Sequence, residues 1–187
     1  MTVSEIINQR RAYRSLDQIE VTQELIEDLT RHAQLAPTCF NNQPARFVFV
    51  KDRAILEQLK PAFSKGNEWC YAASMVIAVF AEREADCIIK DREYYLFDTG
   101  METAFLILRA TELGLVAHPI AGYSPKKVRE VLNIPERYNV ITLILVGKHS
   151  SSISPLLSEK QIEWEKTRPE RLPLNKIMFI DRYQPEK

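Results

Sequence analysis

The 187-residue chain carries 25 Lys and Arg residues against 25 Asp and Glu residues, and 45% of its residues are hydrophobic. The balanced charge gives no overall field that would attract nucleic acid or an anionic membrane, so we expect neither as a partner. No apolar run approaches the roughly 20 residues of a membrane helix, and the N-terminus has no signal-peptide pattern. We therefore expect one globular domain with a sizeable core, located in the cytoplasm.

Capping residues and apolar periodicity predict alternating helices and strands along the first half of the chain. The expected elements are a short helix after Thr2, a helix from Thr22 to Ala36, a strand over 46–51, a helix from Asp52 to Leu59 and a strand over 74–80. The second helix should end before Pro37, because proline disfavours helix in the residue that precedes it. The apolar run 74–80 does not alternate, so we expect a strand that is buried on both faces.

The second half continues this alternation and then changes character. The expected elements are a helix over 92–113, a strand over 116–120, a helix from Ser124 to Leu132, a strand over 140–146, a serine-rich linker over 150–154 and a charged helical turn over 159–166. We expect a compact core over residues 1–148 and a C-terminal arm over 149–187. The arm has too little apolar sequence for its own core, and a partner subunit is a natural surface for it.

A polar loop over residues 36–44 separates the second predicted helix from the next strand, and it is longer than most such connections. Its side chains offer neutral donors and acceptors, and its prolines hold its shape. The candidate binding residues are Pro37, Thr38, Cys39, Asn41 and Gln43. This chemistry suits a flat, polar, heteroaromatic ligand better than a metal or a bare phosphate.

Three arginines, Arg10, Arg11 and Arg14, cluster at the end of the first predicted helix. Guanidinium groups offer the paired planar donors that a phosphate needs, although a solvated basic surface would have the same sequence. A third segment, Pro119 to Gly122, is small enough to let backbone N–H groups approach a ring closely. The cysteines and histidines are scattered and form no CxxC pair, so we expect neither a disulfide framework nor a metal site.

Together these segments resemble the nitroreductase family of FMN-dependent oxidoreductases. The resembling segments are Arg10–Arg14, Ala36–Pro44, Leu113–Leu115, Pro119–Tyr123, Val128–Pro135 and Arg171–Leu174, which cover nearly the whole chain in the family's order. One departure is Ala12, which stands where the family usually has a phosphate-binding serine. The resemblance implies an α+β fold of three layers, with a central, mostly antiparallel sheet flanked by helices. It also implies an intertwined homodimer in which the C-terminal arm is exchanged.

The resemblance assigns the arginines to two parts of the cofactor. Arg10 and Arg171, helped by Arg11 or Arg168, would hold the FMN phosphate. Arg14 would lie by the pyrimidine side of the ring, where positive charge favours the reduced form and raises its potential.

The remaining site residues would surround the flavin ring. By the resemblance, the backbone N–H of Ala121 or Gly122 faces flavin N5, with Pro119 and Ile120 in the same segment. The polar loop would reach the flavin from the other subunit, and Asn67 would lie near the ring edge. No residue is assigned to a metal.

The implied activity is a ping-pong oxidoreductase. NADH or NADPH would act as a transient electron donor, and a small electron-poor acceptor such as a nitroaromatic or a quinone would then use the same face of the ring. One alternative is an enzyme of the same superfamily with another acceptor, such as a dehalogenase or a dehydrogenase. Another is a flavin-binding carrier or sensor without turnover.

Overall fold

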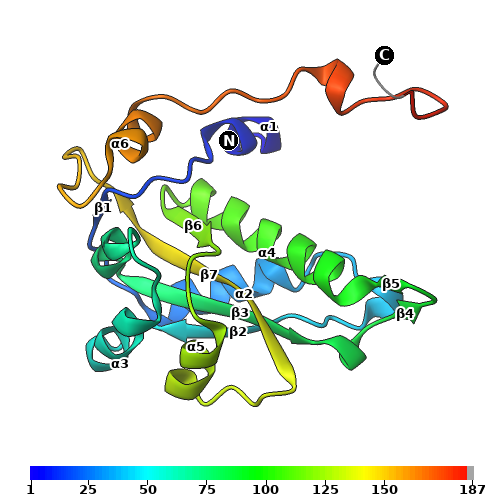
Figure 1. Cartoon of the computed structure of the whole chain (residues 1–187), viewed down its shortest axis with the longest axis horizontal. Coiled ribbons are helices and arrows are strands. Elements are labelled where there is room, and N and C mark those ends of the chain that lie inside the picture. Colours follow the sequence, from blue (N-terminus) through cyan, green and yellow to red (C-terminus); the bar gives the residue numbers. More distant parts are fainter. Residues whose placement is uncertain (185–187) are drawn as a thin grey trace.

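The computed structural model describes residues 1–184, which form a layered α+β structure (Figure 1). The helices are α1 (Val3–Gln9), α2 (Gln23–Ala33), α3 (Arg53–Leu59), α4 (Tyr94–Glu112), α5 (Pro125–Leu132) and α6 (Glu159–Lys166). The strands are β1 (Leu16–Asp17), β2 (Arg46–Val50), β3 (Met75–Glu82), β4 (Ile88–Ile89), β5 (Arg92–Glu93), β6 (Val116–Ile120) and β7 (Tyr138–His149). Within the described residues, no helix is long and apolar enough to cross a membrane.

Strand β7 is the hub of a five-stranded sheet. It pairs with β1, β3 and β6, and β2 pairs with the other side of β3. All of these pairings are antiparallel, with Met75 opposite Val146 and Val50 opposite Val76. The prediction of an α+β fold with a mostly antiparallel sheet between helices is therefore confirmed.

Strand β3 explains why the sheet needs helices on both faces. Its side chains alternate between two buried apolar clusters, one shared with α3 and α5 and the other with α2 and α4. Ala78 belongs to the first cluster and Ile77 to the second, and both are fully buried. Fully burying an aliphatic side chain contributes about 1.5–3 kcal/mol. The expected strand that is buried on both faces is confirmed.

Helix starts follow the capping residues of the sequence. Thr2, Thr22, Asp52 and Ser124 each accept a hydrogen bond from the backbone N–H of the third helical residue. Helix α2 ends at Ala33, earlier than predicted, because the chain turns before it reaches the proline.

The short elements that have no counterpart in the sequence predictions include β1, the β4–β5 hairpin and a 3-10 segment, Glu68–Ala72. Arg92 was expected to begin the long helix, but it lies in β5, and α4 begins at Tyr94. A strand of two residues is too short to show alternation, so sequence patterns give it no signal.

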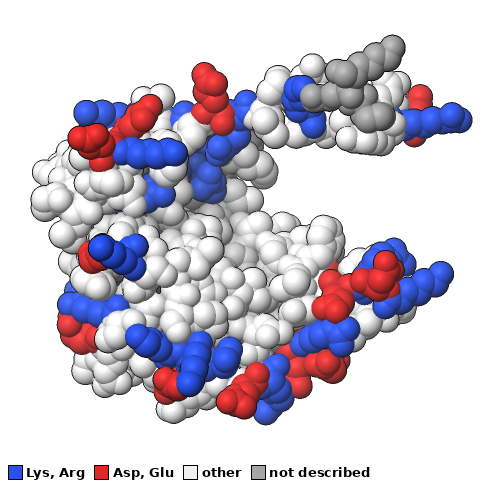
Figure 2. Space-filling model, in the orientation of Figure 1, with Lys and Arg blue, Asp and Glu red and all other residues white. Residues whose placement is uncertain are grey.

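The predicted C-terminal arm divides into two parts. The first part, through α6, packs on the N-terminal segment of its own chain. The second part runs along α1, apart from the main body (Figure 1). Its exposed apolar side chains are Leu172, Leu174, Ile177, Met178, Phe179, Ile180 and Tyr183. In Figure 2 the surface between this part and the main body is hollowed, and mostly uncharged side chains line it. Residues 185–187 of the predicted arm lie outside the described range.

Candidate functional site

Arginines from the two ends of the chain meet in one cavity of about 250 Å³, here called the arginine pocket. Its lining residues are Arg10, Arg11, Ala12, Arg14, Trp164, Arg168, Pro169 and Arg171. Glu165 joins the two segments, because its carboxylate accepts the backbone N–H of Arg14 at 2.6 Å and that of Ser15 at 3.2 Å. The structure thus brings together all five arginines that the sequence analysis assigned to the cofactor.

Two of these arginines are engaged by backbone carbonyls. Arg11 Nη2 donates to two carbonyl oxygens at the C-terminal end of α6, at 2.8 and 3.3 Å, where helix carbonyls lack intrahelical partners. Arg168 Nη2 donates to the carbonyl oxygens of Asn8 and Arg10. These bonds fix α6 and the chain after it on the N-terminal segment. They leave the side chains of Arg10 and Arg171 available.

Arg10 and Arg171 have no carboxylate partner among the ion pairs of the described residues. Burial lowers the pKa of Arg10, and repulsion from Arg168, Arg171 and Arg11 lowers it further. Half-buried cations that repel one another are stabilised when an anion binds between them. The donor set of the pocket therefore fits a phosphate group.

Arg14 lies between the two tryptophans of the chain. Its Cζ is 5.7 Å from the ring centroid of Trp69 and 5.4 Å from that of Trp164, within the range of cation–π contacts. Burial lowers the pKa of Arg14, while the Glu165 carboxylate raises it. The sequence analysis did not single out either tryptophan. The chain has only 2 tryptophans, and this rarity was the one signal that could have drawn attention to them.

Hydrogen bonds hold the turn after β6 in one orientation. Asn67 Nδ2 and the Ser64 N–H both donate to the Gly122 carbonyl oxygen, each at 3.0 Å. The Tyr123 N–H donates to the Ala121 carbonyl oxygen at 3.1 Å. A trans peptide is planar with its N–H opposite its C=O, so the bonded Ala121 carbonyl also sets the direction of the Gly122 N–H. A Cβ atom at Gly122 would collide with the Asn67 side-chain amide.

Asn67 connects this turn to the arginine pocket. Trp69 Nε1 donates to Asn67 Oδ1 at 3.2 Å, and the ring of Trp69 contacts Arg14. Next to the turn, Pro119 is exposed and Ile120 is buried in the sheet. The structure therefore places the turn, Asn67 and the arginines in one region.

A buried histidine supports the backbone between the arginines. His118 Nδ1 lies 2.9 Å from the Tyr13 carbonyl oxygen, and its ring centroid is 4.8 Å from that of Trp69. Burial lowers the pKa of His118 to about 4, although the hydrogen bond to Tyr13 opposes the shift. His118 is therefore neutral at pH 7 and donates its Nδ1–H to Tyr13.

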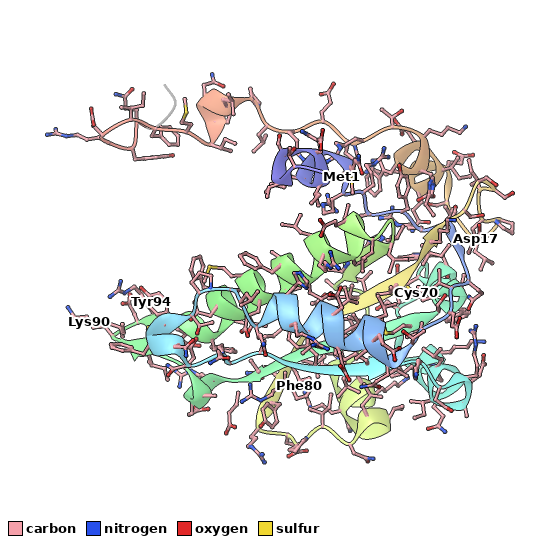
Figure 3. All side chains as sticks on the ribbon, turned by 180° about the vertical axis from the view of Figure 1, so that it is seen from behind. Met1, Asp17, Cys70, Phe80, Lys90 and Tyr94 are labelled. Carbon is pink, nitrogen blue, oxygen red and sulfur yellow. A yellow bond between two sulfur atoms is a disulfide. The ribbon has the colours of Figure 1, made fainter. Side chains whose placement is uncertain are left out.

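The polar loop lies at the other end of the main body, beside the start of α4 and the β4–β5 hairpin (Figure 1). In Figure 3, Lys90 in this hairpin and Asp17 in β1 mark opposite ends of the main body. Two buried acids of α4 hold the loop: the Cys39 N–H donates to Asp98 at 2.6 Å, and the Ala45 N–H donates to Glu102 at 3.1 Å. One chain alone does not bring this loop to its own arginine pocket.

Within the loop, side chains bind their own backbone. Thr38 Oγ1 accepts the Gln43 N–H at 3.0 Å, and Gln43 Nε2 donates to the Asn41 carbonyl oxygen at 3.2 Å. Phe40, Asn41 and Gln43 have positive φ angles of 49°, 58° and 48°. Left-handed backbone is unfavourable for Phe40 and Gln43, and such strain is common at functional sites. Pro37 is exposed at the start of the loop.

The sequence analysis predicts no disulfide framework, and the structure corrects this at one place, where Cys39 and Cys87, 48 residues apart, form a disulfide. The spacing of cysteines along the sequence could not show this, because the approach depends on how the loop lies against the start of α4. Cys70 is free and buried, and burial raises the pKa of its thiol.

The fold and the pocket define an α+β protein with an arginine-lined pocket beside a fixed backbone turn. Residues 7–148 match the profile of the nitroreductase family, and the chain belongs to that family.

Similar proteins carry the same description. A protein from Archaeoglobus fulgidus, named NADH dehydrogenase/NAD(P)H nitroreductase, is 30% identical over 76% of this chain and 82% of its own length. NAD(P)H nitroreductase YdgI of Bacillus subtilis is 28% identical over 77% of this chain and 87% of its own. A solved nitroreductase from Exiguobacterium sibiricum in complex with FMN has a TM-score of 0.80 and 24% identity, covering 97% of this chain and 98% of that one. That structural likeness shows the fold.

Proposed function

We propose that this chain is an FMN-dependent oxidoreductase that takes electrons from NADH or NADPH. The proposal rests on Arg10 and Arg171. Arg10 is half-buried and Arg171 is exposed, and neither forms an ion pair with a carboxylate of the described residues. The phosphate of FMN supplies the missing anion. The family and the names of its similar proteins support the same cofactor and the same electron donor.

When bound, FMN supplies hydride chemistry at its N5 atom. The protein contributes position and charge. Arg14, held between two tryptophan rings, would supply positive charge to the pyrimidine side of the ring. The Gly122 N–H, whose direction the Ala121 carbonyl sets, would be the backbone donor for N5. Asn67 acts through Gly122 by holding its carbonyl oxygen, and it is a positioning residue.

The proposed active form is a homodimer. The arginine pocket of about 250 Å³ is smaller than the usual ligand pocket of roughly 300–1,000 Å³, so it accommodates the phosphate end and leaves the ring uncovered. A second copy would supply the polar loop, Pro37 to Gln43, as the cover. It would also bury the exposed apolar side chains beyond Arg171.

The proposed acceptors are small electron-poor molecules such as nitroaromatics or quinones. They would use the same face of the ring as NAD(P)H, in turn. Steady-state plots at several NAD(P)H concentrations should give parallel lines, whereas intersecting lines would overturn the ping-pong order.

The cofactor assignment is tested by comparing FMN with riboflavin, which lacks the phosphate. Arg10→Ala should weaken FMN by ~1.5–3 kcal/mol, the range of a charge-assisted hydrogen bond, and leave riboflavin affinity nearly unchanged. Fluorescence quenching of the flavin titrated into apoprotein measures both. The matched control is Arg31→Ala, because Arg31 is an exposed arginine of α2 paired with Glu27. Equal losses for the two flavins would show that Arg10 does not bind the phosphate.

A further inference from the structure

A second cluster of chemically reactive side chains lies where the polar loop meets the start of α4. Cys39 Sγ, Cys87 Sγ and a carboxylate oxygen of Asp86 all lie within 4.8 Å of one another. The carboxyl group of Asp98 lies against that of Asp86. We call these four residues the acid–sulfur cluster. It lies at the end of the main body that carries Lys90 in Figure 3.

Asp86 is the most informative member of the cluster. It is 8% exposed, and its Oδ1 accepts the Cys87 N–H at 2.7 Å and Asn42 Nδ2 at 3.1 Å. Its Oδ2 is buried and has no hydrogen-bond partner among the described residues. A buried polar atom without a partner costs about 1–3 kcal/mol, and more when it is charged.

The cluster also lacks a protein cation. Asp98 is 1% exposed, and neither it nor Asp86 takes part in an ion pair with a described Lys, Arg or His side chain. Two adjacent buried carboxyl groups repel each other when both are ionised. A bound cation would neutralise both carboxyl groups and would give Asp86 Oδ2 a partner.

We propose that the acid–sulfur cluster, when its cysteines are reduced, binds one thiophilic divalent cation such as Zn²⁺. Thiolates and carboxylates are both zinc ligands, and thiolates select soft or borderline ions over Mg²⁺ and Ca²⁺. Cys39, Cys87 and Asp86 supply three ligands, and a water molecule would complete the tetrahedral set. The disulfide is the alternative, metal-free state of the same residues.

The backbone positions allow both states. The Cα atoms of Cys39 and Cys87 are 6.2 Å apart. Two Zn–S bonds of about 2.3 Å at a tetrahedral angle would place the sulfur atoms roughly 3.7 Å apart, which rotation about the Cα–Cβ bonds can reach. Both cysteines are half-buried, so an ion can enter from solvent.

The conversion of the disulfide into the metal-bound state conserves electrons and protons. A dithiol reductant supplies two electrons and two protons to the disulfide and becomes a disulfide itself, which leaves two cysteine thiols. Binding of the cation then releases these two protons to solvent, because the thiolate is the ligand. The proposal does not depend on the flavin site.

The experiment uses the full chain as purified. Protein reduced with dithiothreitol and then freed of it is titrated with Zn²⁺ against a chromophoric chelator. The same titration is made on protein oxidised to the disulfide. We expect one Zn²⁺ per reduced chain and none per oxidised chain. Iodoacetamide labelling with peptide mass spectrometry should show that Zn²⁺ protects Cys39 and Cys87. Reduced protein that binds no Zn²⁺, or unprotected cysteines, would overturn the proposal.

Variants identify the ligands. Asp86→Asn keeps the size of the side chain and should weaken Zn²⁺ at least tenfold, and Cys39→Ser should abolish binding. Cys70→Ser is the matched control, because Cys70 is the third cysteine and lies in the apolar core away from the cluster, and it should bind Zn²⁺ as the native protein does. Unchanged affinity in Asp86→Asn would refute the site. Cys70→Ser losing Zn²⁺ while Cys39→Ser keeps it would also refute the site. The labelling experiment on native protein decides the question if a variant fails to fold.

Discussion

The two ends of the molecule present opposite and uncompensated charge. In the arginine pocket Arg10 and Arg171 lack a carboxylate among the described residues, and in the acid–sulfur cluster Asp86 and Asp98 lack a cation. Removing charge from water costs several kcal/mol per ion, so folded proteins rarely leave such groups without partners. The two proposals above accordingly assign ligands of opposite sign to the two ends, an anion to the arginine pocket and a metal cation to the acid–sulfur cluster.

The two ends also differ in how they are built. The arginine pocket joins segments about 150 residues apart, and Glu165 holds them together through backbone hydrogen bonds. The acid–sulfur cluster rests on α4, a helix of 19 residues whose buried acids bind the neighbouring loop. The arginine pocket therefore depends on the C-terminal arm, whereas the acid–sulfur cluster does not.

Truncation of the C-terminal arm should have the largest effect, because it removes part of the arginine pocket and leaves the acid–sulfur cluster intact. A chain that ends after Ser150 lacks Glu165, Arg168 and Arg171, so it should lose FMN and dimerisation while retaining the Zn²⁺ site. A chain that ends after Arg171 keeps the pocket arginines and loses only the apolar tail, so it should become monomeric. Light scattering and flavin absorbance measure these outcomes. The proposed interface belongs to the class of permanent interfaces, which bury more than ~2,000 Å². A full-length monomer that retains FMN would contradict the dimer.

A substitution at Gly122 should show that activity depends on the position of the backbone turn as well as on the charge of the arginines. In Gly122→Val the new side chain collides with the Asn67 amide, so the bond to the Gly122 carbonyl is lost and the turn tilts. A displacement on the order of 1 Å can lower a rate about a hundredfold, so kcat should fall by that order. Gly100→Ala in α4 is the control, since a Cβ there meets nothing within 4 Å. An unchanged kcat in Gly122→Val would show that the turn at Gly122 does not contribute to the reaction.

The smallest expected effect concerns His118 and pH. Its pKa is about 4 in the folded chain and about 6.5 when unfolded, so the unfolded chain binds more protons between these values. Stability should fall as pH drops from 6.5 towards 4, by up to on the order of 3 kcal/mol. His118→Asn keeps a donor near Nδ1 but does not titrate, so its free energy of unfolding should lack this decrease.

Urea unfolding at several pH values measures that difference. Both proteins share the buried Glu102, whose raised pKa acts with the opposite sign, so their difference isolates His118. Parallel pH profiles would show that His118 is not the titrating group.

Much of the fold was visible in the sequence because local chemistry determines it. Capping by Thr2 and Ser124 and the non-alternating run 74–80 each set one element without reference to distant residues. The β4–β5 hairpin and β1 gave no signal, since each strand has two residues and forms only through its partner strand.

The site was predictable only in part. The arginine cluster and the Pro119–Gly122 turn are contiguous motifs, and the structure places them together. Trp69 and Trp164, which are 95 residues apart in the sequence, both contact Arg14. Cys39 and Cys87, which are 48 residues apart, form a disulfide. Such approaches depend on the packing of the whole chain, which no local pattern encodes.

The position of β7 has a consequence for synthesis on the ribosome. β7 is the last strand of the sheet to be made, yet it pairs with β1, β3 and β6. Until residue 149 has left the exit tunnel, β6 has no hydrogen-bonded neighbour and β3 has only β2. The nascent chain therefore exposes β6 and one edge of β3 until β7 emerges, and the sheet is completed only in a late step.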